Sequence, residues 1–362
     1  AKNQHLKHAT VINITAHSLM NKITITTPDD WHVHVRSGQL LRTVITHTAK
    51  RFKRAIIMPN LNPPITTVTQ ALHYRNEILH ALPENSAFNP LMTLYLTDTT
   101  SAEEIHNAAD CEHIKGFKLY PSGATTNSQS GISQLEKTYP LLDAMQKHSI
   151  PLLIHGEVTD NDIDIFDREK IFIDRHLATL TQKFPNLRII LEHITTQEAV
   201  HFIQEQSSQI AATITPQHLM FNRNVFLVGG IKPHYYCLPV IKRETHRQAL
   251  LAAATSGNPK FFLGTDSAPH PQYRKESNCG CAGCFSAHAA IEFYTEIFEQ
   301  AGALNKLEGF ASHFGADFYQ LPRNQSTLCL VKENWTIPAT YPAGNDEIIP
   351  LNAGEECTWK VL

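Results

Sequence analysis

The sequence predicts an α/β fold, a (β/α)8 TIM barrel with a small β appendage from its N- and C-terminal segments. Eight short apolar runs that are typical of buried strands alternate along the chain with segments of helical periodicity. Such alternation is typical of a parallel sheet covered by helices, and eight units predict that the sheet closes into a barrel. The length of 362 residues is ordinary for a barrel of this kind with insertions.

The expected elements follow one another in order. The eight strands are expected to end at Arg36, Asn60, Thr97, Tyr120, Glu157, Ile194, Thr215 and Asp266. The helical segments are 40–52, 67–81, 132–148, 165–184, 195–206, 241–256 and 287–300. Short β-like pieces at 328–331 and 358–362 are expected to form the appendage together with 22–27. Long loops at 121–131 and 216–238 follow the fourth and seventh strands, where long loops are usually functional.

The composition is that of a globular protein, with 42% hydrophobic and 18% charged residues. A formal charge of -3 gives no electrostatic reason to expect a nucleic acid or an anionic membrane as partner. No apolar run approaches the roughly 18 residues of a membrane-spanning helix. The seven scattered cysteines argue against a disulfide framework and favour a reducing, cytoplasmic location. We interpret residues 21–362 as one domain and residues 1–20 as an N-terminal extension that does not resemble a secretory signal.

Six potential metal ligands or bases stand where expected strands give way to loops. They are His32, His34, Lys118, His155, His193 and Asp266. The carboxyl ends of barrel strands meet at one mouth, so a single site explains all six together. Each also has an ordinary interpretation, as a hydrogen-bonded core histidine or, for the lysine, as a partner in a salt bridge.

Strand geometry gives the His-x-His pair its meaning. Alternate side chains of a strand share a face, so His32, His34 and Arg36 are expected to point one way. Trp31 and the two valines Val33 and Val35 are then expected to point the other way. Burying polar groups without partners costs about 2–7 kcal/mol each, and a metal ion would satisfy the two imidazoles.

Lys118 is an unusual candidate ligand, because an ammonium group has no lone pair and is repelled by a divalent cation. Carbamylation of its amine by CO₂ would produce an anion with two oxygens that can bridge two metals about 3.5–4 Å apart. Asp266 follows the apolar run FFLG and can both ligate a metal and accept a proton from water. The pattern predicts a metal-assisted hydrolase.

Three clustered cysteines, Cys279, Cys281 and Cys284, suggest a zinc site at first sight. Structural zinc usually takes four ligands, in two separated pairs. We therefore favour a compact turn over the barrel mouth.

The chain resembles the amidohydrolase superfamily and, within it, the bacterial-type monofunctional dihydroorotases. The motifs that carry the resemblance are PDDWHVHVR, MPNLNPP, KLYPSGATTNS, LLIHGEVT, EHITT, TPQHLMFNRN, KPHYYCLP, GTDSAPH and KESNCGCAGCF. They occur in the family's order between residues 27 and 285, with weaker similarity up to the C-terminus. The resemblance implies two zinc ions bridged by carboxylated Lys118. One ion would be bound by His32, His34 and Asp266, and the other by His155 and His193.

The resemblance also implies how a substrate is held. Its carboxylate would be bound by Arg36, Asn60 and His270, and backbone groups of Leu238 and Ala282 would meet the edge of a pyrimidine ring. Thr125 and Thr126 match a mobile loop that closes on the substrate, and a homodimer is implied. Ser37 stands where the family usually has Asp, which puts the local support of Arg36 in question.

The implied activity is the reversible interconversion of N-carbamoyl-L-aspartate and L-dihydroorotate in pyrimidine biosynthesis, with Asp266 as base and acid. The first alternative is a hydrolase of a neutral cyclic ureide, such as a dihydropyrimidinase or allantoinase. Arg36 argues against it, because a neutral ring offers a guanidinium no anionic partner. The second alternative is an inactive scaffold, which would be expected to lack some of the six ligands.

Overall fold

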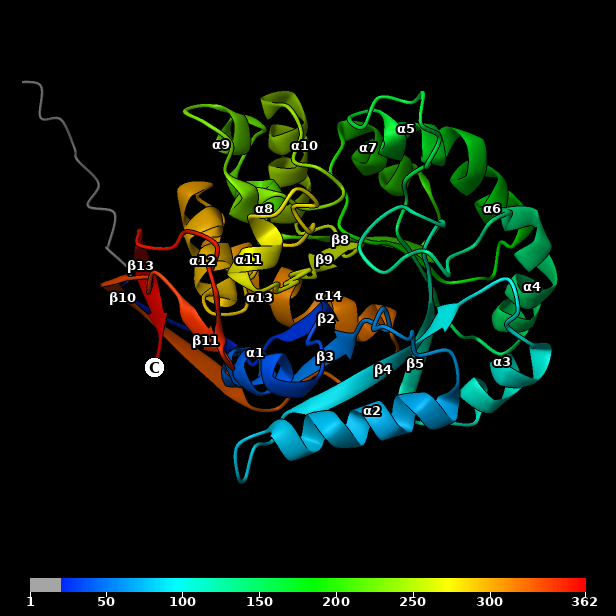
Figure 1. Ribbon diagram of the computed structural model, residues 1–362, viewed down its shortest axis with the longest axis horizontal. Helices are drawn as coiled ribbons and strands as arrows, with labels where there is room; N and C mark the ends of the chain where they lie inside the picture. Colours follow the sequence, from blue (N-terminus) through cyan, green and yellow to red (C-terminus); the bar gives the residue numbers. More distant parts are fainter. Residues whose placement is uncertain (1–20) are drawn as a thin grey trace, which may run out of the picture.

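Eight parallel strands form the central sheet, in the order in which they occur along the chain (Figure 1). The computed structural model describes residues 21–362. The strands are β2 (Asp29–Val33), β3 (Arg54–Ile57), β4 (Asn89–Leu96), β5 (Ile114–Leu119), β6 (Leu152–Ile154), β7 (Ile189–Leu191), β8 (Ile210–Ile214) and β9 (Phe261–Leu263). Each strand pairs in parallel with the next, as predicted for a (β/α)8 barrel.

The first and last strands of this sheet, β2 and β9, are joined by hydrogen bonds just beyond β9. The backbone N–H of Asp266 donates to the carbonyl of His32 at 2.8 Å, and the N–H of His34 donates to the carbonyl of Ser267 at 3.0 Å. Three predicted site residues therefore form the seam of the barrel. Closure of the sheet itself sets the distances between them.

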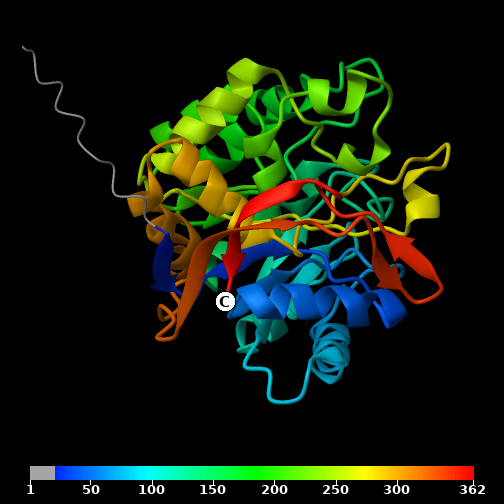
Figure 2. The same cartoon turned by 90° about the vertical axis from the view of Figure 1, so that its left-hand side faces the viewer.

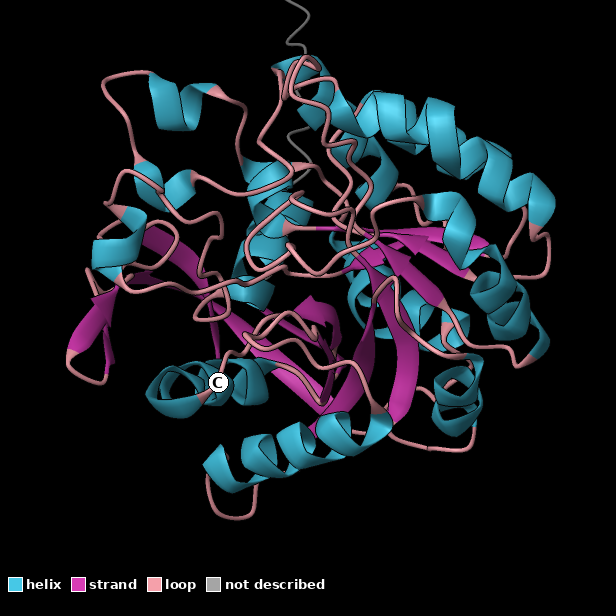
Figure 3. Ribbon diagram, turned by 45° about the vertical axis from the view of Figure 1, so that its right-hand side comes forward, coloured by secondary structure: helices cyan, strands magenta, loops and turns pink. Residues whose placement is uncertain are grey.

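Helices surround the strands, while the loops that follow the strands gather over one end of the sheet (Figure 3). The helices between consecutive strands, and the one after β9, agree closely with the predicted segments. They are α1 (Gly38–Arg51), α2 (Val68–Ala81), α4 (Tyr139–Lys147), α5 (Arg168–Phe172), α6 (Ala178–Lys183), α7 (Gln197–Glu205), α10 (Glu244–Thr255) and α12 (Ala290–Gln300). A turn of π-helix, Ile173–Leu177, joins α5 to α6. The chain continues from α12 into α13 (Leu304–Glu308) and α14 (Phe314–Phe318).

Two sequence predictions about helices need correction. The short helix α3 (Ala102–Ala109) was not predicted; it has 8 residues and buries only Ile105 and Ala108. The segment 216–238 is not one long loop, since it contains α8 (Pro216–Met220), α9 (Asn224–Leu227) and a 3-10 turn at Pro233–Tyr235. Pro216 stands at the first position of α8 behind the capping side chain of Thr215, an arrangement that favours a helix start.

The strands end one to three residues earlier than the sequence predicted. A register shift between Asp30 and Val33 interrupts the regular pairing of β2 with β3. The alternation expected around the histidines is therefore wrong for Trp31. The Trp31 side chain packs against Ile56 and Phe262 in a small apolar cluster made mostly of strand residues. The side chains of Val33 and Val35 instead belong to the larger apolar cluster, which also contains residues of the surrounding helices.

The predicted appendage is a three-stranded antiparallel sheet of order β1–β10–β13. Its strands are β1 (Lys22–Thr26), β10 (Thr327–Thr336) and β13 (Glu356–Val361), and Figure 2 turns this sheet toward the viewer. A hairpin of β11 (Tyr341–Ala343) and β12 (Asp346–Ile348), which was not predicted from the sequence, lies between β10 and β13 in the chain. The expected N-terminal extension, residues 1–20, lies outside the described residues. Within residues 21–362, no helix combines the length and apolarity required to cross a membrane.

Candidate active site

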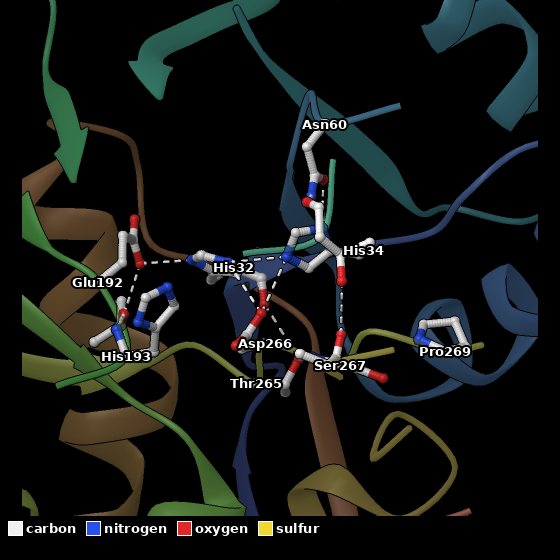
Figure 4. Close-up of polar contacts among 12 residues, drawn as sticks. His32, His34, Asn60, Glu192, His193, Thr265, Asp266, Ser267 and Pro269 are labelled. Carbon is white, nitrogen blue, oxygen red and sulfur yellow. Dashed lines mark hydrogen bonds and ion pairs between the residues drawn. The ribbon is translucent and has the colours of Figure 1, made fainter. Parts of the chain in front are cut away.

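Two imidazoles and one carboxylate converge at the barrel seam (Figure 4). The Nε2 atoms of His32 and His34 lie 3.3 Å apart. Asp266 Oδ1 lies 3.3 Å from His32 Nε2 and 3.0 Å from His34 Nε2. All three side chains are buried. Among residues 21–362, these three form the group of His, Cys, Asp and Glu side chains with spacing suited to a metal ion.

The remaining nitrogens of both histidines are already engaged. His32 Nδ1 lies 2.8 Å from Glu192 Oε2, and His34 Nδ1 lies 2.7 Å from Asn60 Oδ1. Both oxygens are acceptors, so an imidazole that carries a single proton keeps it on Nδ1 and presents the lone pair of Nε2. Thr213 Oγ1 donates to the same Glu192 oxygen at 2.6 Å and holds it in place. An oxygen acceptor behind the imidazole is the usual partner of a metal-bound histidine.

The charge states fit a cation at this point. Burial lowers the pKa of His34 to about 4, so its ring is neutral near pH 7. Burial alone would raise the pKa of Asp266, but the charge of His32, whose own pKa is raised, and the contacts with His32 and His34 hold it well below its usual range. The carboxylate of Asp266 is therefore ionised beside the neutral ring of His34, and positive charge at this point stabilises it.

The other predicted ligands gather beside this group. The ring centroid of His193 lies 5.0 Å from that of His32 and 4.8 Å from that of His155. His155 Nε2 bonds to Glu157 Oε1 at 2.7 Å, while His193 Nδ1 is buried and has no hydrogen-bond partner within the described residues. Burial lowers the pKa of His193 well below its usual value, so this ring is also neutral.

Lys118 lies on β5 and is fully buried, and its Nζ makes no hydrogen bond within residues 21–362. Burial lowers its pKa to about 8, although the carboxylates of Glu192 and Asp266 act in the opposite direction. The charge of Lys118 helps to lower the pKa of His193 and opposes the rise in the pKa of His32, so the amine lies within electrostatic reach of both imidazoles. The nearest partner of the amine is the ring of Tyr120, 5.2 Å from Nζ to the centroid. A buried amine that lacks a hydrogen bond and lies close to histidine rings is the arrangement that a bridging carbamate would explain.

The residues of the predicted carboxylate pocket lie next to the candidate metal ligands. Arg36 donates through Nε to the carbonyl of Pro269 at 3.0 Å, and its NH2 group lies 3.1 Å from His270 Nε2. Burial, reinforced by the charge of Arg36, lowers the pKa of His270 to about 2, so His270 is neutral. Asn60 reaches the same pocket. The guanidinium therefore has neutral partners here and remains available to an anion.

Ser37 does not support Arg36 through its side chain. It precedes α1 without a capping hydrogen bond and is exposed. The backbone of Arg36 has a φ of 60°, and its carbonyl accepts a hydrogen bond from the hydroxyl of Tyr74 at 2.6 Å. Tyr74 on α2 and Pro269 hold the arginine, so the departure from the family pattern at position 37 leaves it anchored.

The long loop 121–131 lies over the pocket. Asn60 Nδ2 donates to the carbonyl of Thr126 at 3.2 Å, and Thr126 Oγ1 donates to the carbonyl of Ala282 at 3.3 Å. Thr125, Thr126, Leu238 and Ala282 line a pocket together with the histidines and Asp266. The free space between these side chains is about 20 Å3, so the loop leaves little room in the pocket as it stands.

Several residues of the site were not predicted. Glu192 stands directly before His193, and a glutamate that ends the apolar run IIL was the available clue. Asp30 accepts hydrogen bonds from Thr265 at 2.9 and 2.6 Å and stabilises the barrel seam. Tyr120 lines the pocket with a buried hydroxyl that has no partner within the described part of the chain. The three clustered cysteines have different environments, with Cys279 exposed and Cys284 buried.

Comparison with known proteins defines the class of protein. The model of the amidohydrolase family matches residues 25–329. This match covers most of the chain, so the chain belongs to the amidohydrolase family. A solved L-hydantoinase (dihydropyrimidinase) from Arthrobacter aurescens has the same fold, with a TM-score of 0.77 over 94% of this chain and 83% of that one. At 15% sequence identity, it shows the fold alone.

Two more similar proteins narrow the assignment within the family. A dihydroorotase of Nitrosococcus oceani is 61% identical over 95% of this chain and 99% of that protein. The crystal structure of dihydroorotase in complex with 5-fluoroorotic acid from Saccharomyces cerevisiae has a TM-score of 0.87 at 36% identity, covering 94% of this chain and 98% of that one. The chain therefore belongs to the dihydroorotases, hydrolases that act on a cyclic amide in pyrimidine biosynthesis, which confirms the resemblance found in its motifs.

Proposed function

We propose that this site interconverts N-carbamoyl-L-aspartate and L-dihydroorotate with two zinc ions bridged by carboxylated Lys118. The observation that carries the proposal is the convergence of two imidazole Nε2 atoms and an ionised carboxylate beside Arg36, which forms no ion pair within residues 21–362. The two imidazoles and the carboxylate are suited to a cation, and the arginine is suited to an anionic ligand. A neutral cyclic ureide would leave Arg36 without one.

The residues fit two metal ions as follows. His32, His34 and Asp266 would hold one ion, His155 and His193 the other, and the carbamate of Lys118 would contact both. When bound, the ions would supply Lewis acidity toward the amide carbonyl and lower the pKa of water. Zinc is supported by the imidazole and carboxylate ligands, which also suit cobalt and manganese.

Asp266 is the proposed general base and general acid. Its carboxylate is ionised and fixed beside the two Nε2 atoms, so it can accept the proton of the attacking water in the hydrolytic direction. It then returns this proton to the departing amide nitrogen. In the synthetic direction the same carboxylate accepts the proton of the attacking nitrogen.

Arg36, Asn60 and His270 are the proposed pocket for the substrate carboxylate. The yeast relative whose structure was solved with 5-fluoroorotic acid binds a ligand that is itself a carboxylic acid, which supports this assignment. Free backbone groups support a role for Leu238 and Ala282 at the ring edge, since the N–H groups of both form no backbone hydrogen bond within residues 21–362. Loop 121–131 would open to admit the substrate and close over it through Thr125 and Thr126.

A homodimer in the cytoplasm completes the proposal. The dimer rests on the family resemblance, and the location rests on the seven cysteines, which are all free. Sedimentation analysis of the purified protein tests the dimer directly.

The proposal is tested by an ultraviolet assay of dihydroorotate formation and loss, with metal analysis of the same sample. We expect about two zinc ions per chain, loss of activity after chelation and partial recovery with cobalt or manganese. Dihydrouracil, a neutral ring, serves as the control substrate and should turn over poorly. Full activity in a verified metal-free sample, or a preference for dihydrouracil, would overturn the proposal.

A further inference from the structure

Lys275 is a buried lysine behind the wall of the substrate pocket. It is the last residue of α11 (Gln272–Lys275), and its side chain is 3% exposed. Its Nζ donates to the backbone carbonyls of Tyr236 at 2.8 Å, Cys281 at 2.7 Å and Gly283 at 2.8 Å. An ammonium group has three N–H donors, so all of them are used.

The charge of Lys275 has no acidic partner. Within residues 21–362, no carboxylate forms an ion pair with its Nζ. Burial lowers the pKa of Lys275, and the nearby charge of Arg36 acts in the same direction. A buried charge without an opposite charge is costly, so one is expected only where its position serves a purpose.

The three carbonyls belong to the two segments that reach the substrate pocket. Cys281 and Gly283 flank Ala282, and Tyr236 stands two residues before Leu238. The N–H of Gly283 also donates to the carbonyl of Tyr236 at 3.0 Å. Gly283 is tightly enclosed, since a Cβ atom there would lie 2.4 Å from the carbonyl oxygen of Ala268. The ammonium group of Lys275 therefore links the segment around Tyr236 to the segment 281–283.

This contact fixes a donor that a substrate can use. The carbonyl of Cys281 and the N–H of Ala282 belong to one planar peptide group, so holding the carbonyl sets the direction of the N–H. A charged donor on the carbonyl also polarises the peptide and strengthens its N–H as a donor. The carbonyl of Ala282 in turn contacts Thr126 of loop 121–131 at 3.3 Å and His270 at 3.0 Å.

We propose that Lys275 is a positioning residue for substrate recognition, which aligns Leu238 and Ala282 against the ring edge and adds positive charge behind the carboxylate pocket. The inference rests on the proposed function of the pocket. It assigns Lys275 to binding of the anionic ring and not to metal binding or to proton transfer.

The chain offers a matched control in Lys260. This lysine precedes β9 at the opposite end of the barrel strands, and its Nζ also donates to three backbone carbonyls. Two of them, Ile203 and Gln204, are at 3.2 Å, and the third is Gln206. Lys260→Met removes the same kind of contact without touching the pocket.

The experiment compares Lys275→Met, Lys275→Gln and Lys260→Met in the zinc-loaded protein. Measured quantities are kcat and KM for dihydroorotate, Kd for orotate, zinc content and melting temperature. For Lys275→Met we expect KM and Kd to rise on the order of tenfold, a loss equivalent to about 1.4 kcal/mol. Zinc content should be unchanged and kcat should fall by less than KM rises. Lys275→Gln, which keeps two N–H donors, should recover part of the affinity, and Lys260→Met should lower only the melting temperature.

Failure of the inference is distinct from failure of the proposed function. A wild-type protein without dihydroorotase activity would contradict the proposed function. An active wild type with unchanged KM and Kd in folded Lys275→Met, or with equal losses in Lys260→Met, would overturn the role of Lys275. If both Lys275 variants fail to fold while Lys260→Met folds, Lys275 is structural and the inference is wrong.

Discussion

Replacing Arg36 with Met is the most direct test of how this site selects its substrate. Methionine keeps much of the apolar bulk of the arginine side chain but removes the planar fork that pairs with a carboxylate through two hydrogen bonds. The backbone at position 36 should keep its shape, because Tyr74 holds its carbonyl at 2.6 Å. The side-chain contacts to Pro269 and His270 are lost together with the charge.

The structure sets the size of the effect. Truncating one partner of a buried, hydrogen-bonded charge pair costs about 2–5 kcal/mol. Arg36 is only partly buried, and water can partly replace it, so the lower half of this range applies. A loss of about 2–3 kcal/mol corresponds to a fall of roughly 30- to 150-fold in kcat/KM for dihydroorotate.

The assay follows dihydroorotate and dihydrouracil side by side in wild type, Arg36→Met and Arg36→Lys. The lysine variant keeps the charge without the fork and should fall between the other two. The penalty should be large for dihydroorotate and small for dihydrouracil, which has no carboxylate. Equal losses for both substrates, or no loss for either, would refute carboxylate recognition by Arg36 and reopen the dihydropyrimidinase alternative.

Four further predictions concern the metal ligands and the loop over the pocket. Lys118→Ala should lower zinc content and abolish most of the activity, with partial rescue by a small carboxylic acid; electron density for an unmodified lysine in an active, zinc-loaded crystal would contradict this. The pKa of Lys118 is lowered to about 8, and CO₂ reacts with the neutral amine, so reactivation of metal-free protein by zinc at fixed dissolved CO₂ should accelerate with pH. The rate should rise about tenfold per pH unit below pH 8 and level off above it, and a rate independent of pH would exclude the carbamate. The double variant Thr125→Ala/Thr126→Ala should reduce turnover while zinc content stays constant, and unchanged kinetics would argue against a lid. Glu192→Gln weakens the acceptor behind His32 and should lower zinc affinity by about 10- to 100-fold in a chelator competition, whereas unchanged affinity would show that this contact is dispensable.

The sequence alone determined the class of fold and most of the residues in the site. Eight apolar runs alternating with helical segments predict the closed sheet, because each strand and helix leaves its own local pattern of hydrophobicity. A polar residue at the end of a buried run is also a local feature. The six candidate ligands and Arg36 can therefore be proposed from the order of residues, whereas Asn60 was added by the resemblance of the motifs.

Local patterns were insufficient where the chain departs from regular geometry. The pairing of β2 with β3 shifts register between Asp30 and Val33, on either side of Trp31. The residue types around Trp31 do not indicate this shift. The helix α3 has only 8 residues and buries two side chains, so it is short enough to be taken for part of a loop. The turns within 216–238 depend on capping contacts such as that of Thr215, which many loop sequences also contain.

Tertiary structure decided which residues support the ligands and how they meet. Glu192 and His32 are 160 positions apart, and only closure of the barrel brings their side chains to 2.8 Å. The carbonyl contacts of Lys275 join two segments that lie about 45 positions apart in the sequence. Hydrogen bonds of this kind depend on distances and angles in three dimensions, which a linear pattern of residue types does not specify. The proposed ligands can thus be identified from the sequence, whereas their protonation states and supporting contacts depend on the fold.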